Sequence, residues 1–271
     1  MKTRMPAVVG QFYPGSADAL RESVSAYIES AQVDAAPKAP CALVAPHAGH
    51  VYSGACAGYA FARARHARPK RVVLLGRSHR YAFRGLSLCE ESVFQMPLGD
   101  MPVDEACAKA VRDAAPPAAS EAHSHEHALE VLLPFVQVAF GNIPIVPLLF
   151  GEDPDLWHLE FGRKLNTILD ETDLLIASTD LSHFLSEPEA RALDKKTLDG
   201  ILAQDCAAVP RQLQEETASM CGGTAVVVAM AYALARGASQ WNLLDYRTSA
   251  DVSGDYDRVV GYGALSMEYE A

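Results

Sequence analysis

Three apolar runs of this sequence are followed by histidines or by an aspartate and a histidine. His47 directly follows CALVAP, His79 lies three residues past RVVLLG, and Asp180 and His183 follow DLLIAST. A single loop histidine is more often a cap or a surface residue than a functional one. Recurrence after three apolar runs is hard to attribute to packing, because a buried imidazole needs polar partners. The spacing therefore predicts a functional cluster.

These residue types suit a metal site. Neutral imidazole is the commonest side-chain metal ligand, and a catalytic metal commonly takes three protein ligands while one position stays open. Cys221 opens CGGTAVVVAM just ahead of a predicted helix, and a helix N-terminus lowers a thiol pKa and favours the thiolate. His47 and His79 supply two ligands, and four residues are candidates for the third: Asp180, His183, Glu126 and Cys221.

Two alternative functions, a thiol hydrolase and a serine hydrolase, would use the same part of the sequence in a different way. Cys221 could be a nucleophile with His183 as base and Asp180 as orienter, although a thiol hydrolase leaves the other two histidines without a role. Ser178 or Ser182 could serve a serine hydrolase, but the sequence has no G-x-S-x-G elbow. A P-loop is excluded, since no G-x-x-x-x-G-K-[ST] occurs.

The elements around these residues alternate between strands and helices. The run 41–46, a helix at 55–67 and the run 71–76 form a βαβ unit, whose strands lie parallel with a right-handed crossover. Ligands collect at the carboxyl ends of such strands. We expect an α/β fold with a central, mostly parallel sheet flanked by helices. The other expected helices are 16–32, 102–115, about 126–140, 154–169, 188–204, 206–216 and 223–236, and the other expected strands are 143–151, 173–179, 241–248 and 259–269.

Composition limits the class of protein. The 271 residues show no linker, so we expect one domain over 1–271. The net charge of -11 argues against nucleic-acid partners, which need a basic face. No run approaches the roughly 18 apolar residues of a membrane span, so we expect no membrane partner. The six scattered cysteines read as reduced thiols, and the expected location is cytoplasmic.

Seven segments in one order resemble the MEMO family, in its bacterial and archaeal branch that is often encoded near radical-SAM proteins. The resemblance runs nearly end to end and is far more specific than any single motif. The segments are PAVVGQFYPG at 6–15, APHAGHVYSG at 45–54, VVLLGRSH at 72–79, HEHALEVLLPF at 125–135, IASTDLSHF at 176–184, MCGGTA at 220–225 and SADVSGDYDRVVGYGAL at 249–265.

The resemblance implies a fold and a metal. MEMO proteins are structurally similar to class III extradiol dioxygenases, which are non-haem Fe(II) enzymes on an α/β sheet. Matching the family's motifs segment by segment implies His47, His79 and Cys221 as metal ligands. The dioxygenases use a carboxylate where this family places its thiol. Iron is therefore the expected cofactor, and zinc or copper suits the same ligands in principle.

The resemblance also implies roles around the metal. Asp180 and His183 belong to the family's D-x-x-H segment and would be the catalytic, proton-handling residues beside the metal. Glu126 and His127 fall on its EH segment and would close the pocket wall.

The expected function is metal-dependent redox chemistry, dioxygenase-like, on a small-molecule substrate. Arg77 and Arg80, on either side of His79, differ from the residues usual in the family at these positions. Their two guanidinium groups favour an anionic substrate. A radical-SAM protein is a candidate partner from the family's gene neighbourhood. A peptide- or phosphopeptide-binding adaptor using the same cleft, or a Cys-dependent hydrolase, remains an alternative.

Overall fold

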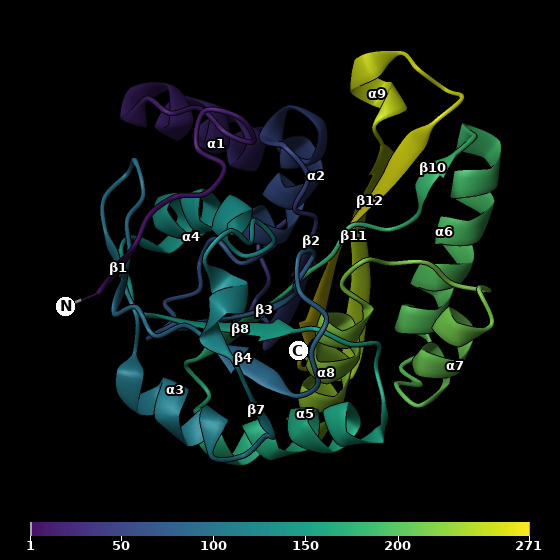
Figure 1. Ribbon diagram of the computed structural model, residues 1–271. Coiled ribbons are helices and arrows are strands. Elements are labelled where there is room, and N and C mark those ends of the chain that lie inside the picture. The colour runs from purple at the N-terminus through teal and green to yellow at the C-terminus, as the bar shows by residue number, and fades with distance from the viewer. Residues whose placement is uncertain (1, 271) are drawn as a thin grey trace.

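The computed structural model describes residues 2–270 and shows an α/β domain with helices on both faces of a large sheet (Figure 1). The strand order is β10-β12-β2-β9-β3-β8-β4-β7, and β11 lies beside β12. None of the helices in this described part of the chain is long and apolar enough to cross a membrane.

Four parallel strands form the centre of the sheet. Their residues are buried almost throughout, which explains the continuous apolar runs, because central parallel strands are covered on both faces. The expected strand–helix–strand unit is confirmed, but the later strand β9 lies between its two strands. In sheet order the central strands are β2 (Ala42–Ala45), β9 (Leu174–Ser178), β3 (Val72–Arg77) and β8 (Ile145–Phe150).

The flanks of the sheet are mixed. Antiparallel pairs join β12 to β2, β10 to β12 and β4 to β8. The expected α/β fold is confirmed, and its parallel strands lie at the centre of the sheet. Several short strands carry too little pattern to be predicted from sequence. Outside the centre lie β10 (His183–Leu185), β11 (Gln240–Thr248), β12 (Val259–Glu268), β4 (Leu86–Leu88) and β7 (Pro117–Ala118), with β1 (Thr3–Arg4), β5 (Val93–Phe94) and β6 (Met101–Pro102) in a small second sheet.

Two hydrophobic cores lie on opposite faces of the central strands. One packs under α1 (Ala17–Ser30), α2 (His50–Arg63) and α4 (Leu133–Phe140). The other packs under the remaining long helices, whose central member α8 is buried over most of its length. These are α3 (Glu105–Arg112), α5 (Leu156–Ile168), α6 (Glu187–Leu202), α7 (Ala208–Gln214) and α8 (Gly223–Ala235), and a short α9 (Ala250–Ser253) follows β11.

Two helix starts differ from expectation for local reasons. The helix α2 begins at His50, five residues early, because the His50 N–H donates to the Phe12 carbonyl at 2.7 Å. Residues 126 and 127 do not start a helix, since α4 begins at Leu133 after a single turn at Glu130–Leu132. The Glu126 carboxylate instead accepts the N–H groups of residues 127 and 128 and holds them in a loop.

The close approach of α1 and α2 requires a glycine. A Cβ at Gly58 would lie 2.3 Å from the Tyr27 carbonyl oxygen, a backbone atom. We expect Gly58→Ala to lower the free energy of unfolding by about 1–3 kcal/mol, as overpacking does. The matched control is Gly200→Ala in α6, where the close neighbour is the flexible end of Gln212 and alanine should stabilise the helix by up to about 1 kcal/mol. Urea unfolding of both variants checks this, and equal stabilisation would contradict it.

Candidate metal centre

The carboxyl ends of three central strands lie side by side. Ala45 of β2 is paired with Ser178 of β9, and β9 is paired in turn with β3. Two residues past the end of each strand stand His47, Asp180 and His79. Because parallel strands end at the same edge of the sheet, residues far apart in sequence meet here. The residues of the predicted cluster therefore lie close together in space.

Cys221 reaches this edge from the loop before α8. Its N–H donates to the Asp180 carbonyl at 3.1 Å, and the Asp180 N–H donates back to Sγ at 3.2 Å. This pair of hydrogen bonds fixes the thiol against the end of β9. One ligand atom each from His47, His79 and Cys221 then lies within 4.8 Å of the others, a separation that one metal ion can bridge.

The ring of His47 is held in one orientation. Its Nδ1 lies 2.7 Å from the Ser178 hydroxyl, and that hydroxyl donates to the Ala128 carbonyl at 2.5 Å. Since the hydroxyl proton is already used, Nδ1 must carry the donated hydrogen, and Nε2 keeps its lone pair. Nε2 lies 3.3 Å from Cys221 Sγ. Burial, reinforced by neighbouring His79 and His127, holds the pKa of His47 well below its usual value.

A carboxylate orients the second histidine. Glu126 accepts from His79 Nδ1 at 2.9 Å and from the His79 N–H at 2.6 Å, which leaves His79 Nε2 for a metal. Burial alone would raise the pKa of Glu126. The hydrogen bonds from His79 and Ala128 outweigh burial and lower it to about 2. Glu126 is therefore a buried hydrogen-bond partner of His79, a more specific position than the pocket wall predicted from sequence.

The Cys221 thiol differs from the sequence prediction. Its place ahead of a helix predicts a lowered pKa, whereas burial, followed by the nearby Asp180 charge, raises it to about 12. Desolvation of the thiolate outweighs the helix N-terminus, which starts only at Gly223. Without a positive charge at the site this residue is a thiol. A metal ion would supply that charge.

The two residues of the D-x-x-H segment lie in different surroundings. Asp180 is buried, its Oδ1 accepts the His47 N–H at 2.8 Å, and burial raises its pKa. His183 starts β10 with an exposed side chain, and its Nδ1 lies 2.9 Å from the Leu181 carbonyl. The Cys221 Sγ lies within hydrogen-bond distance of His47 Nε2. Within residues 2–270 no hydrogen bond joins Cys221 to His183, so the Cys221–His183–Asp180 triad of a thiol hydrolase is not assembled.

A third imidazole stands at the site. The His127 ring centroid lies 4.6 Å from that of His79 and 5.5 Å from that of His47. The family resemblance implies only a place in the pocket wall for His127. The run His-Glu-His at 125–127 is the sequence feature that points to a histidine at the site. The local sequence does not show which of its two imidazoles faces the site.

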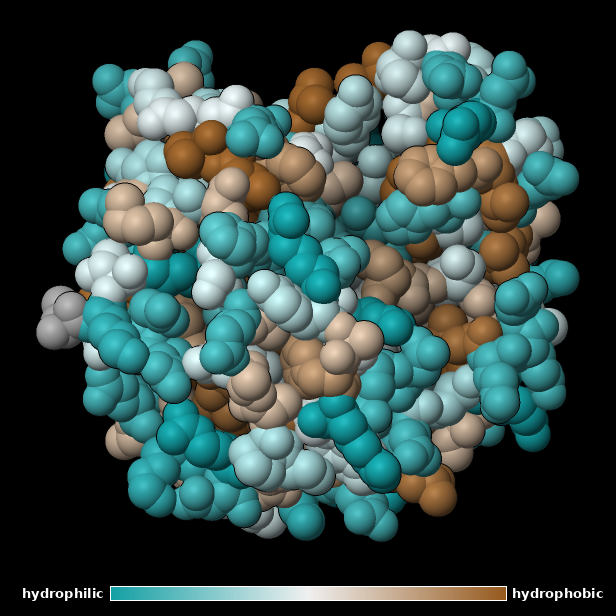
Figure 2. All heavy atoms as spheres, in the orientation of Figure 1, coloured by the Kyte–Doolittle hydropathy of each residue, from teal (hydrophilic) through white to brown (hydrophobic). Residues whose placement is uncertain are grey.

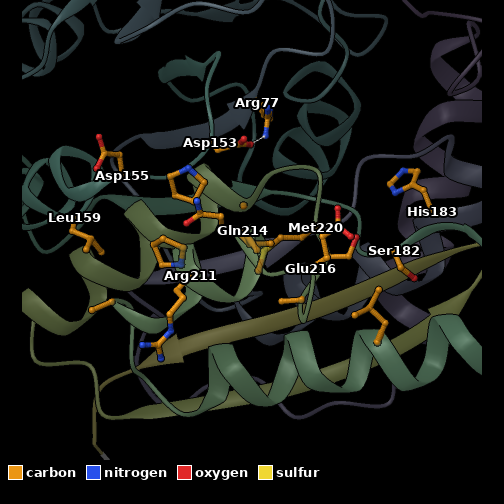
Figure 3. Close-up of a pocket in the computed structure, with 18 of the residues that line it drawn as sticks. Arg77, Asp153, Asp155, Leu159, Ser182, His183, Arg211, Gln214, Glu216 and Met220 are labelled. Carbon is orange, nitrogen blue, oxygen red and sulfur yellow. Dashed lines mark hydrogen bonds and ion pairs between the residues drawn. The ribbon is translucent and has the colours of Figure 1, made fainter.

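Two cavities border the site, and His183 lines both. The smaller, of about 430 Å³, is also lined by His127 and Asp180 and lies between the start of α2 and α9. The larger, of about 850 Å³, extends toward α7 and has Arg77 and Arg211 in its wall. Figure 3 shows Arg77 and Asp153 at one end of it and His183 at another.

The arginines that favoured an anionic substrate already have partners. Arg77 forms an ion pair with Asp153 at the wall of the larger cavity. Arg80 donates through Nε to the His125 carbonyl at 2.9 Å. An anionic substrate would have to share these guanidinium groups with the protein's own acceptors, so the preference for anions stays a prediction.

Comparison with known proteins shows which family shares these segments. The family profile described as Memo-like protein matches residues 4–266. The chain belongs to the Memo family. It is 33% identical to a MEMO1 family protein of Methanopyrus kandleri over 97% of this chain and 98% of that protein. It is 34% identical to one of Archaeoglobus fulgidus, over 97% and 98% of the two chains.

Memo-family relatives also occur in bacteria. A MEMO1 family protein of Thermotoga maritima is 32% identical over 96% of this chain and 97% of that protein. Among solved structures, an uncharacterized protein from Escherichia coli K12 is similar over 73% of this chain and 86% of that one, with a TM-score of 0.49 and 18% identity. A likeness this low says nothing about activity.

Proposed function

We propose that this Memo-family protein is a non-haem iron protein that carries out dioxygenase-like redox chemistry on a small molecule, with His47, His79 and Cys221 as the ligands. The observation that carries the proposal is the convergence of these three ligand atoms within 4.8 Å of one another. Their place at one edge of a parallel sheet supports it, since such edges are the usual ligand sites of α/β folds.

The residues present fit a metal. Ser178 and Glu126 each take the hydrogen of a ligand histidine's Nδ1, which leaves both Nε2 lone pairs free for coordination. The thiol becomes an anionic ligand once a metal displaces its proton. Two imidazoles and one thiolate suit iron, zinc and copper. The side chain of His79 is 31% exposed, so the site is open to a substrate or a further ligand.

Bound iron would supply the one-electron and dioxygen chemistry that side chains lack. The protein would supply position and proton transfer. Because the Leu181 carbonyl can only accept, His183 donates from Nδ1, and its Nε2 can take a proton from a substrate in either cavity. Asp180 fixes His47 through the backbone N–H. We assign His183 the proton transfer and Asp180 the orientation of the site.

The location belongs to the same proposal. All six cysteines are free thiols. An oxygen-dependent site with a thiolate ligand would need a reducing compartment to keep that sulfur reduced. We propose the cytoplasm.

Elemental analysis tests the metal directly. Protein purified without chelators, or loaded anaerobically with Fe(II), should hold close to one iron per chain. The His47→Ala, His79→Ala double variant should hold at most about a tenth of that, because two of the three ligands are gone. The control is His66→Ala, which changes an exposed histidine.

Each outcome bears on the proposal. Stoichiometric iron in the wild type and the control, lost in the double variant, would support it and justify a search for oxygen-dependent substrates. Stoichiometric zinc that iron cannot replace would contradict the redox function. A wild type that binds no metal would contradict the whole proposal and favour a peptide-binding cleft.

A further inference from the structure

A buried arginine, Arg4, donates hydrogen bonds to the loop that carries Glu126. The Arg4 side chain is almost wholly buried, and its guanidinium donates in three directions. Nε donates to the His123 carbonyl at 2.8 Å, Nη2 to the Glu126 carbonyl at 2.5 Å, and Nη1 to the Glu130 carboxylate at 2.7 Å. One planar group thus contacts the start, the middle and the end of the segment 123–130.

Glu130 completes the attachment from the other side. Besides Arg4, its carboxylate accepts the N–H of Ala7 at 2.7 Å, the N–H of Val8 at 3.0 Å and the Tyr13 hydroxyl at 2.7 Å. All four acceptor positions of the carboxylate are used. The segment from Arg4 to Tyr13 is therefore bound to the loop by one fully paired carboxylate.

The same N-terminal segment also contacts the other side of the site. The Phe12 ring packs edge-on against His127, with 4.9 Å between ring centroids. The Phe12 carbonyl accepts the His50 N–H at 2.7 Å, next to the turn that carries His47. Residues 4–13 therefore bridge the loop behind His79 and the helix start behind His47.

A buried ion pair is a poor device for stability alone. The free energy lost when both charges leave water is about as large as the free energy gained from their attraction. Proteins in which apolar residues replace such a pair are often equally stable. The better-attested benefit of a buried ion pair is that it enforces one specific geometry. Here the geometry concerned is that of Glu126, whose backbone Arg4 holds and whose carboxylate orients His79.

We infer that the Arg4–Glu130 pair is a positioning device for the metal centre: it fixes the loop 123–130 and, through Glu126, the His79 ring. The inference rests on the proposed function. It assigns Arg4 no contact with metal or substrate.

The chain offers a matched control. Arg71 is also buried and paired, with Nε 2.8 Å from the Asp173 carboxylate. These two residues precede β3 and β9, at the edge of the sheet opposite the metal centre. Arg71→Met therefore breaks a comparable ion pair without touching the Glu126 loop.

Co(II) titration, read by absorbance, separates positioning from stability. We expect Arg4→Met to weaken Co(II) binding about 10–100-fold, the usual effect of losing a partner of a metal ligand, whereas Arg71→Met should stay within about threefold of the wild type. Arg4→Lys, which keeps the charge but loses the planar three-way contact, should fall between them. If Arg4→Met does not fold, the Arg4→Lys variant provides the test in its place.

A second readout needs no metal. The N–H groups of His79, His127 and Ala128 all donate to Glu126, so in metal-free Arg4→Met they should exchange with deuterium faster than in Arg71→Met. Equal losses of affinity and of protection in the Arg4 and Arg71 variants would overturn the inference, as would Arg4 variants that bind Co(II) like the wild type. A wild type that binds no Co(II) would instead overturn the proposed function, and this inference with it.

Discussion

Replacing Cys221 with alanine is expected to weaken metal binding about a hundredfold to a thousandfold, since one ligand carries roughly a quarter of the 10–16 kcal/mol of a four-ligand zinc site. Cys221 is the only residue of the three-residue cluster that can become an anionic donor. It is also the donor that a metal must ionise, because burial and Asp180 raise its thiol pKa to about 12. Competition with a chelator of known affinity measures the change.

The spectrum of the Co(II) protein adds a qualitative signature. The wild type should show a thiolate-to-cobalt charge-transfer band, and Cys221→Ala should lose it even at saturating cobalt. Cys206→Ala, which changes a buried cysteine outside the cluster, should keep both the band and the affinity. A Cys221→Ala protein with the band intact would show that sulfur at this position is not a ligand.

Gly222→Ala is expected to damage fold and site together. A Cβ at Gly222 would lie 2.2 Å from the Ser178 carbonyl oxygen and 2.8 Å from Thr179 Cβ. The end of β9 and the loop before α8 would have to separate, and Cys221 would move with the loop. We expect a loss of about 1–3 kcal/mol of stability, typical of overpacking, and a loss of metal affinity of at least about 10–100-fold.

A second glycine shows whether this effect is specific. A Cβ at Gly15 would meet only ordinary contacts, the nearest at 3.7 Å from Val9, so Gly15→Ala should leave stability nearly unchanged and affinity equal to the wild type. Denaturant unfolding and Co(II) titration measure both. Wild-type affinity in Gly222→Ala would contradict the close packing of Cys221 against β9.

The pattern of apolar runs and the family resemblance together identified many residues of this site. Apolar runs identified the central strands because strands buried on both faces need apolar side chains at every position. Polar residues at the ends of those runs then marked one edge of the sheet. The family's motifs added Cys221, which the residues alone left as one of several candidates for the third ligand.

The sequence could not supply the partners of these residues. The sequence predicts a helix start at Glu126, but its carboxylate accepts hydrogen bonds from backbone N–H groups, one of them that of residue 79, and so it shapes a loop. The sequence offers Ser178 as a candidate nucleophile, whereas its hydroxyl sets the tautomer of His47. Such roles depend on long-range contacts, which local periodicity does not encode.

By itself the sequence determined which polar residues follow the apolar runs, because residue type and position after an apolar run are properties of the chain. The tertiary structure decided the order β2-β9-β3, which makes neighbours of His47, Asp180 and His79. It also decided the burial that raises the pKa of Cys221 above that expected at a helix start. Both follow from how distant segments pack, since desolvation and hydrogen-bond partners exist only once the chain has closed around the site.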